Sequence, residues 1–383
     1  MGSRSGAAGR RATRARRIAL AAAVLLLVAV FEPAAGAATI RYSATPVASW
    51  RPVGIGRSVL VVGNVVYVGG EFASVRNPAG TATVTRRNLA AFDATTGALI
   101  STFRADTNGS VRALASDGAR LYVGGQFTNV NGTARSRLAA VDLATGAVRN
   151  WSADVNSNVY SLAAAGGRVY VGGAFGSIAG QPRANVGAVD AATGAVVAGF
   201  RPNTNGSVYA LAASGDGSQI YLGGSFNQVA GTARASIARL TPAGALVNVN
   251  WRTFTDPVFA LSLRPDTTRL AVAYAGTANQ GAYFDTGSGV RLWSNRCDGD
   301  GQAIEIVEDS VFVGHHEGCN SDTSVRLMSW SAANGARDTG FRPSFDRFYG
   351  VWAIDGNTSV LAVAGDFTRI SGVATQGFAL FRR

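Results

Sequence analysis

Both histidines and both cysteines of the chain fall between residues 297 and 319, together with several carboxylates. Imidazole and carboxylate groups are ligands for Zn²⁺ and similar ions, and they could equally hold a polar organic ligand. Neighbouring residues of a strand point to opposite faces, so His315 and His316 do not readily share one ion. A metal site, a non-metal ligand site and a plain braced loop all stay open as interpretations. The candidate residues here are Asp298, Asp300, His315, His316 and Glu317.

The two cysteines flank a pair of apolar segments. Cys297 precedes the first segment and Cys319 follows the second, so the ends of this expected hairpin should meet on one side of the molecule. No third cysteine competes, and an exported chain meets an oxidising environment. We therefore predict a Cys297–Cys319 disulfide.

A second group of candidates occupies the second position of successive apolar segments. The flanking positions are mostly Val and Leu or Ile, whereas this position varies and is rich in aromatic residues. Aromatic rings together with an Arg and a Gln are suited to stacking on, and bonding to, a sugar or a peptide; packing between neighbouring units is the alternative. The residues are Leu60, Arg112, Tyr160, Tyr209, Phe259, Gln302 and Trp352.

Standard catalytic motifs are missing from the sequence. It has no Gly-x-Ser-x-Gly elbow, no phosphate-binding loop and no His-Glu-x-x-His helix motif. We therefore expect no catalytic residue, no cofactor and a binding or scaffold role, with an extracellular glycan or protein as partner. An enzyme, either a hydrolase or lyase or a quinone-type oxidoreductase, using the segment around 297–319 is the alternative.

One phrase, Tyr-Val-Gly-Gly-x-Phe, recurs along the chain and defines the elements that must position these residues. Its strong copies begin 55, 48 and 51 residues apart, at Tyr67, Tyr122, Tyr170 and Tyr221. Three weaker copies begin near residues 270, 311 and 361, which makes seven. A period near 50 residues is typical of repeat architectures.

Each repeat has the pattern of four short strands. Apolar residues alternate with period two between turns, and Thr-Gly turns such as Thr145-Gly146 precede the last strand. Four-strand units bury both faces only when they stack around a ring. The sequence therefore predicts an all-β fold, a seven-bladed β-propeller over residues 38–383. We expect the paired glycines to let neighbouring blades approach closely and the following Phe to fill the gap between them.

The two ends of the chain complement each other. Six fourth strands end in an aromatic residue, and the last repeat stops after its third strand. The missing strand is at the start, where Ser49-Trp50-Arg51-Pro52 matches Gly199-Phe200-Arg201-Pro202. We therefore expect residues near 40–52 to complete the last blade, beside residues 376–382, and to close the ring.

The first 37 residues have the pattern of a secretory signal peptide. Arginines between Arg10 and Arg17 precede an apolar stretch, Ile18 to Phe31, that is short for a membrane span, and Ala35-Gly36-Ala37 is a cleavage site. An uncleaved anchor is the alternative. We expect a secreted monomer with no membrane attachment after cleavage.

The net charge of +12 includes six arginines that precede residue 18. The remaining arginines are scattered rather than clustered, which argues against nucleic acid as a partner.

The phrase Tyr122-Val-Gly-Gly-Gln-Phe127, followed by Asn131-Gly-Thr-Ala-Arg135, resembles the delta-60 type β-propeller repeats of secreted bacterial proteins. The resemblance covers nearly all of residues 40–383 and implies a propeller at or outside the cell surface, without shared catalytic chemistry. Ala91-Phe-Asp-Ala-Thr-Thr-Gly97 more loosely resembles quinoprotein repeats. The vicinal cysteines and metal-ligand set of quinone-dependent dehydrogenases are not found in the sequence.

Overall fold

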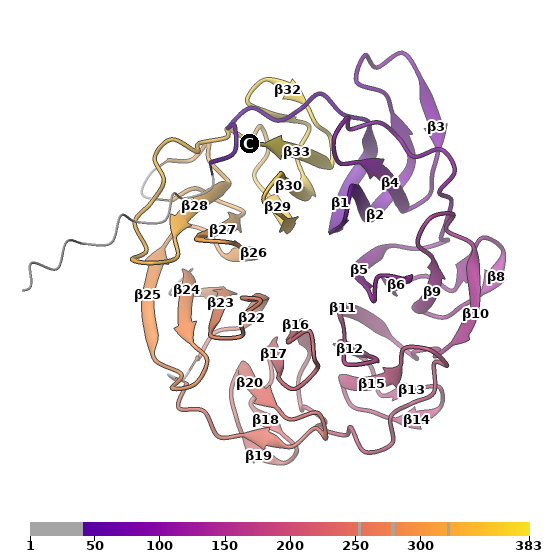
Figure 1. The fold of residues 1–383 in the computed structure, drawn as a ribbon, viewed down its shortest axis with the longest axis vertical. Helices are drawn as coiled ribbons and strands as arrows, with labels where there is room; N and C mark the ends of the chain where they lie inside the picture. The colour runs from indigo at the N-terminus through magenta and orange to yellow at the C-terminus, as the bar shows by residue number, and fades with distance from the viewer. Residues whose placement is uncertain (1–40, 252–253, 277–279, 320–321) are drawn as a thin grey trace, which may run out of the picture. The chain divides into compact units, whose positions relative to one another are not determined.

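Alternating apolar residues between tight turns fold into short antiparallel strands, and the strands gather into seven blades around a central channel (Figure 1). The computed structural model describes residues 41–251, 254–276, 280–319 and 322–383. The expected signal segment, with its cleavage site at Ala37, lies outside the described residues. No helix long and apolar enough to cross a membrane occurs in the described part of the chain.

The innermost strand of each blade lines the channel. In order from blade one to blade seven these strands are β1 (Arg51–Val62), β5 (Val111–Ser116), β11 (Asn158–Ala165), β16 (Val208–Ala213), β22 (Val258–Leu263), β26 (Gly301–Val307) and β29 (Gly350–Gly356).

The second strands carry the recurrent phrase. They are β2 (Val65–Arg76), β6 (Arg120–Gly125), β12 (Arg168–Ala174), β17 (Ile220–Gly224), β23 (Arg269–Tyr274), β27 (Ser310–His315) and β30 (Val360–Asp366). The third strands are β4 (Leu89–Asp93), β9 (Leu138–Asp142), β15 (Val186–Asp190), β20 (Ile237–Leu240), β24 (Gln280–Asp285), β28 (Leu327–Ser331) and β33 (Phe378–Arg382).

The outermost strand is the least regular. Blades two, four and five have β10 (Val148–Ser152), β21 (Leu246–Val247) and β25 (Arg291–Arg296), whereas in blades one, three and six a single bridge such as Phe92–Leu99 takes its place. Blade five, whose copy of the phrase is the weakest, nevertheless forms a complete four-stranded sheet. The alternation of apolar residues, rather than the phrase itself, therefore builds a blade.

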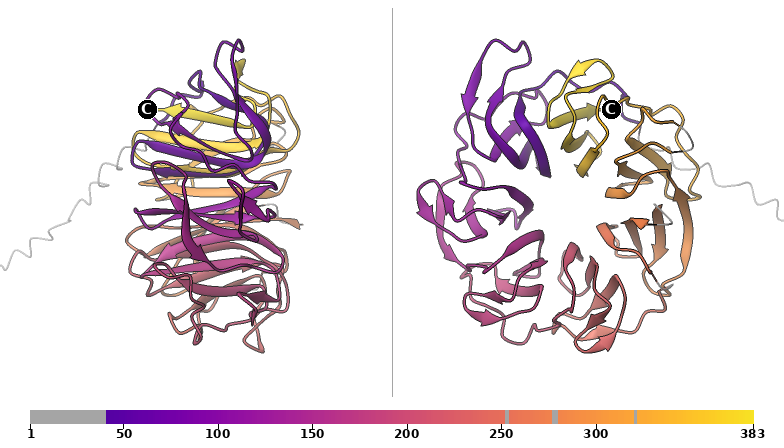
Figure 2. Two further views of the ribbon diagram at one scale, coloured as in Figure 1. Left: turned by 90° about the vertical axis from the view of Figure 1, so that its right-hand side faces the viewer. Right: turned by 180° about the vertical axis from the view of Figure 1, so that it is seen from behind.

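The loop after the second strand adds a small outer hairpin in most blades (Figure 1), and Figure 2 shows the same ring from its edge and from behind. In blade one, β3 (Thr83–Thr85) pairs with the end of β2. Elsewhere the hairpins are β7 (Asn129–Val130) with β8 (Thr133–Ala134), β13 (Ser177–Ile178) with β14 (Gln181–Pro182), β18 (Gln228–Val229) with β19 (Thr232–Ala233), and β31 (Arg369–Ile370) with β32 (Val373–Ala374).

The core is divided among the interfaces between blades. Seven clusters of buried apolar side chains each join two neighbouring blades, including the one between blade seven and blade one. The Phe of the repeated phrase is buried within them, as at Phe127 and Phe226. This arrangement confirms the all-β, seven-bladed propeller and the expectation that the Phe fills the space between blades.

The start of the chain closes the ring, as predicted. The Ser43 N–H donates to the Arg382 carbonyl over 2.7 Å, and the Val47 N–H donates to the Leu380 carbonyl over 2.7 Å. Tyr42 is buried in the cluster shared by blades six and seven. The prediction needs one correction: residues 41–50 pair with β33 without forming a regular strand, and β1 begins at Arg51.

Candidate functional site

Each innermost strand contains one extra residue opposite two neighbouring residues of the second strand, which are the paired glycines of the repeated phrase in blades one to four. In blade two, Val111 pairs with Gly125 and Ala113 with Gly124, so Arg112 is left in a β-bulge. The same register shift occurs in all seven blades. The residues at the bulge, which we call the mouth ring, are Arg57, Arg112, Tyr160, Tyr209, Phe259, Gln302 and Trp352.

The two glycines of the repeated phrase leave room for different neighbours. A Cβ added to Gly124 would lie 2.6 Å from Cγ1 of Val159 in the next blade, which agrees with the expected close approach of blades. A Cβ added to Gly125 would lie 2.0 Å from the Ser110 carbonyl oxygen, next to the bulge. The second glycine therefore makes room for the bulge that directs Arg112 to the mouth of the channel.

The mouth ring surrounds a hollow of about 480 Å³, to which Asp300 also contributes. Six of the seven residues singled out in the sequence at this position lie here. Leu60 does not, because the bulge of blade one falls between Gly56 and Ser58 and brings Arg57 to the mouth instead. Leu60 lies farther along the channel and packs against the core between blades one and two. The pair Gly56-Arg57, which matches Gly301-Gln302, is the sequence signal that identifies the right register.

On one side of the mouth ring, the side chains are held together by cation–π contacts and ion pairs. Arg57 lies over the Trp352 ring at 4.8 Å from its centre, and Arg112 lies 5.9 Å from the centre of the Tyr160 ring. Glu71 joins the two guanidinium groups, at 3.1 Å from Arg57 Nε and 3.6 Å from Arg112 Nη2. Glu71 is the variable residue of the Tyr-Val-Gly-Gly-x-Phe phrase, a position that sequence reasoning did not single out.

The opposite side of the mouth ring is an aromatic platform made of Tyr160, Tyr209 and Phe259. The ring centres of Tyr160 and Tyr209 lie 5.6 Å apart, and those of Tyr209 and Phe259 lie 5.5 Å apart. The Ser225 hydroxyl is 3.3 Å from the Tyr209 hydroxyl. Contacts of this kind fix the rings relative to one another, which lowers the entropy that a ligand loses when it stacks on them.

Further aromatic surface borders the hollow beside Trp352. Tyr349 stacks on Trp352 with ring centres 6.2 Å apart, and it touches Phe348 in turn. Phe348 and Tyr349 are 50% and 52% exposed, which is unusual for side chains of this size. The aromatic surface therefore extends from the mouth ring onto the rim.

Three polar atoms of the mouth ring have no hydrogen-bond partner among the described residues: Nε of Arg112, Oε1 of Gln302 and Nε1 of Trp352. The Gln302 acceptor and the Trp352 donor form a pair that no ion bridge serves, and both atoms are shielded from solvent. Buried polar atoms are normally bonded. A ligand group that both donates and accepts hydrogen bonds could satisfy the pair.

The acidic and histidine residues predicted in blade six divide between two places. Asp300 lines the hollow, and its carboxylate lies 3.9 Å from Nδ1 of His316. His316 also packs against Phe348, with ring centres 5.3 Å apart. Asp298 and Glu317 are not among the residues that line this hollow. The two groups of candidates identified in the sequence thus meet only at Asp300.

His315 turns away from His316 and is completely buried. It packs against the disulfide that joins Cys297 to Cys319, whose Cα atoms lie 4.1 Å apart. Burial lowers the pKa of His315 to about 4, so the imidazole is neutral near pH 7. The opposite directions of the two histidines agree with the expectation that they do not share one ion.

The channel behind the mouth contains a pair of carboxylates that sequence reasoning missed. Glu305 and Asp355 lie three residues beyond the bulge in blades six and seven, at a position that is Leu, Ala or Ser in the other blades. Burial raises the pKa of Asp355 to about 6. Burial, and then the negative charge of Asp355, raise the pKa of Glu305 well above its usual value. Acidic residues at an otherwise apolar position of the repeat were the available signal.

Asp355 also links the last blade to the first. One of its carboxylate oxygens accepts a hydrogen bond from the Val61 N–H over 2.7 Å, and the other accepts from the Gly356 N–H over 2.8 Å. Ser262 makes the corresponding link between blades five and six by accepting from the Ile306 N–H over 3.0 Å. Asp355 therefore helps to join neighbouring blades, and together with Glu305 it also lines the channel.

A separate polar hollow of about 520 Å³ lies among the outer turns of blades one and two. Its groups are bonded to one another: Asp106 accepts from the Arg87 N–H over 2.8 Å and pairs with Arg104 Nε at 2.8 Å. The Ser136 N–H donates to Asp154 in the same way in the next repeat. Because the network recurs with the repeat, we attribute it to blade architecture.

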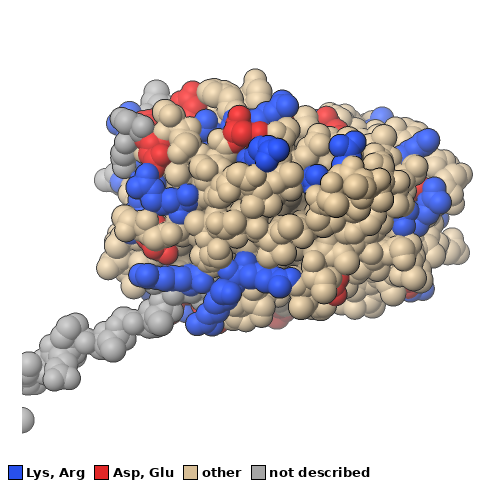
Figure 3. Space-filling view, turned by 90° about the horizontal axis from the view of Figure 1, so that it is seen from above, with Lys and Arg blue, Asp and Glu red and all other residues tan. Residues whose placement is uncertain are grey.

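Charged side chains outside the channel are dispersed. On the face that Figure 3 displays, arginines form several separate groups, with acidic side chains among them. Several arginines are instead bonded to backbone carbonyls, as Arg86 and Arg183 are, which gives these guanidinium groups a structural role.

Comparison with known proteins supports the fold and the repeat. A family model described as a domain of unknown function (DUF5122) beta-propeller matches residues 218–246, which lie in blade four. No curated protein matches the sequence. The chain is thus a β-propeller repeat protein, and the finer assignment to the delta-60 type rests on the sequence resemblance alone.

Solved propeller structures are similar to this chain in fold. A chain of the mitotic checkpoint complex has a TM-score of 0.63 at 16% identity and covers 97% of this chain and 99% of its own. The WD40 β-propeller domain of Doa1 has a TM-score of 0.60 at 13% identity, covering 88% and 97%. The Cps50 (Swd1) propeller of Myceliophteria thermophila has a TM-score of 0.58 at 11% identity, covering 88% and 99%. Identities this low show a shared fold and not a shared ligand.

Proposed function

We propose that this protein is a secreted, monomeric binding module, without catalytic activity or cofactor, that holds an extracellular glycan at the mouth of its central channel. Propellers in general serve as binding or scaffold modules, and the hollow at the mouth is the concave site that such a role requires. The aromatic platform of Tyr160, Tyr209 and Phe259 carries the proposal, because sugar rings present apolar C–H faces that stack on aromatic rings.

The unpartnered polar atoms favour a hydroxyl-rich ligand over a purely apolar one. A sugar hydroxyl can accept from Trp352 Nε1 and donate to Gln302 Oε1, since a hydroxyl has both capacities. A protein partner is the second candidate for the same mouth, favoured by the exposed Phe348 and Tyr349. Neither nucleic acid nor a membrane is part of the proposal.

The Tyr209→Ala variant should bind the selected glycan at least about tenfold more weakly than the natural protein, a difference of roughly 1.4 kcal/mol. Tyr209 is the central ring of the platform, so its removal separates Tyr160 from Phe259. The glycan is selected with the mature protein on a glycan array, and its affinity is then measured by calorimetric titration.

Two further variants make this experiment decisive. Tyr209→Phe keeps the ring and should retain most of the affinity, and Leu292→Ala removes an exposed apolar side chain from β25 and should change nothing. Equal affinity of Tyr209→Ala and the natural protein would exclude the platform as the site. If a protein binds and no glycan does, the ligand is a protein rather than a glycan, and the mouth of the channel remains the proposed site.

Enzymatic activity at the same channel is the second candidate function, and the Glu305–Asp355 pair favours it. A pair of neighbouring carboxyl groups with raised pKa values resembles the acid and base that glycoside hydrolysis uses. Prolonged incubation of the selected glycan with the protein, followed by chromatography of the products, decides between binding and cleavage. Products that disappear in Glu305→Gln would establish the enzyme.

Secretion is tested separately. The signal segment should be removed after Ala37, so that protein recovered from the medium begins at Ala38. N-terminal sequencing or the intact mass checks this. Recovery of the full chain in a membrane fraction would favour an anchor instead.

A further inference from the structure

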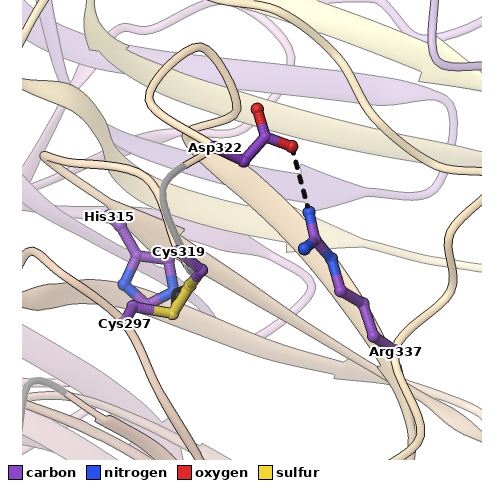
Figure 4. Close-up of a disulfide and its surroundings, with 5 residues drawn as sticks. All are labelled: Cys297, His315, Cys319, Asp322 and Arg337. Atoms are coloured by element: carbon purple, nitrogen blue, oxygen red, sulfur yellow. Dashed lines mark hydrogen bonds and ion pairs between the residues drawn. A yellow bond between two sulfur atoms is a disulfide. The ribbon is translucent and has the colours of Figure 1, made fainter.

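The disulfide of blade six is accompanied by a buried histidine whose ring nitrogen faces both sulfur atoms (Figure 4). Nε2 of His315 lies 3.3 Å from Sγ of Cys297 and 3.9 Å from Sγ of Cys319. The ligand atoms of the three residues all lie within 4.8 Å of one another, and all three residues are buried. The site is distinct from the mouth ring, because none of the three residues lines the hollow there.

His315 stands where the repeat otherwise favours glycine. It pairs with Gly301 at the bulge of blade six, as Gly125 pairs with Val111 in blade two. Its Nδ1 has no side-chain partner among the described residues, and the residue is 0% exposed. Burying an imidazole costs hydration free energy, and a disulfide alone does not need such a neighbour.

The surroundings suit a buried metal site. The Trp330 ring packs edge-on against His315 with ring centres 6.2 Å apart, and Met328 belongs to the same buried cluster. Cys319 forms a β-bridge with Asp322, and the Asp322 carboxylate pairs with Arg337 at 3.5 Å (Figure 4). Fixed ligands in a dry shell are the conditions that tight metal sites require.

We propose that reduction of the Cys297–Cys319 disulfide converts this cluster into a Zn²⁺ site with two thiolates and His315 Nε2 as ligands. A phosphine reductant, for example, delivers two electrons to the disulfide. Water supplies the oxygen of the phosphine oxide and the two protons of the thiols. Zn²⁺ then displaces both thiol protons into solvent and binds the two thiolates and the imidazole, with water as the fourth ligand.

The geometry agrees with this assignment. Bonds of about 2.3 Å to sulfur and 2.0–2.1 Å to nitrogen in a tetrahedral site place sulfur and nitrogen about 3.5 Å apart. The two Sγ–Nε2 distances, 3.3 and 3.9 Å, lie on either side of that value. Only the sulfur–sulfur bond has to open. The hairpin of β26 and β27 is then held at the same place by either of two mutually exclusive links, the disulfide or the metal.

Zinc retention by oxidised and reduced protein tests the proposal. The mature chain is stripped with chelator, treated with or without the phosphine, incubated with Zn²⁺ and desalted, and thiols and zinc are counted. We expect no free thiol and no zinc in the oxidised protein, and two thiols before metal addition and about one zinc per chain after it in the reduced protein. Retention of zinc by the oxidised protein, or none by the reduced protein, would overturn the proposal.

Two histidine variants locate the metal. His315→Gln should weaken zinc binding to the reduced protein at least tenfold, whereas His316→Gln, the neighbouring residue directed toward Asp300, should bind as the natural protein does. Unchanged binding in His315→Gln would show that the thiols act without the histidine and would refute the site. If His315→Gln does not fold, Cys319→Ser supplies the test, because it leaves one thiol and should lose the metal.

Discussion

Removing residues 38–50 should lower the melting temperature by roughly 5 °C or more and cause the protein to aggregate. These residues supply the outer edge of blade seven through the hydrogen bonds of Ser43 and Val47 to β33. They also bury Tyr42 against the core between blades six and seven. Without them the backbone groups of β33 are exposed, and an unpaired strand edge pairs readily with another molecule.

A matched control separates the loss of closure from the mere shortening of the chain. A chain that begins at Arg41 keeps Tyr42, Ser43 and Val47, and it should melt like the mature protein. Scanning calorimetry gives the melting temperatures, and light scattering at several concentrations gives the aggregation state. A chain beginning at Arg51 that stays monomeric with an unchanged melting temperature would show that the ring does not depend on this segment.

Replacing Glu305 by Gln should stabilise the protein above about pH 6 and leave its stability near pH 4 unchanged. The pKa of Glu305 is raised in the folded state, so the folded protein holds the proton more tightly than the unfolded chain does. The corresponding stability is fully present below the unfolded pKa of about 4.5 and is lost as the pH rises through the folded pKa. Asp355, with a pKa of about 6, contributes with the same sign.

The gain should grow as the pH rises from about 4.5 and level off above the folded pKa of Glu305. The measurement is the difference in melting temperature between variant and natural protein at each pH from 4 to 8. This difference removes the opposite contribution of turn aspartates such as Asp142 and Asp190, whose pKa values are lowered by hydrogen bonds from Thr145 and Thr193.

Glu308→Gln serves as the control for this titration. Glu308 lies in the same blade, in the exposed turn after β26 and outside the channel, so this variant removes a glutamate without touching the channel carboxylates. If the difference in melting temperature for Glu305→Gln does not change with pH, or if this variant is less stable than the natural protein at pH 8, the fold does not raise the pKa of Glu305.

The role of the channel carboxylates bears on function as well as on stability. Raised carboxyl pKa values favour the protonated form, which makes the channel wall less negative and can donate a hydrogen bond to a ligand. In the mouth ring above the carboxyl pair, the negative charge of Glu71 partly balances the positive charges of Arg57 and Arg112. The channel is therefore suited to neutral, hydroxyl-bearing groups, in accord with the proposed glycan.

Local patterns were sufficient for the architecture because the fold repeats. Alternating apolar residues and recurrent turns specify each strand from nearby residues, and seven similar units leave a ring as the way to bury every face. The complementary ends of the chain, the missing fourth strand after Phe381 and the extra one before Pro52, predicted the closure. The disulfide followed from two cysteines at the ends of one hairpin.

The composition of the site depended on the register between strands. A bulge decides which residue reaches the mouth of the channel, and in blade one it lies at Arg57, three residues before the predicted Leu60; the other six members of the mouth ring agree with the prediction. The bulge of blade one follows from the pairing of Gly56 with Gly70 and of Ser58 with Gly69, which is a property of two strands and not of one.

The number of blades, the way the ring closes and the residues available to each face are predictable from the sequence, because they depend on spacing along the chain. Which of those residues meet depends on how the blades pack. That packing brought Asp300 to the mouth ring, turned His315 onto the disulfide and set Glu305 beside Asp355 from the neighbouring blade. Contacts between blades join residues about 50 positions apart, and the packing of whole sheets, rather than any local pattern, fixes them.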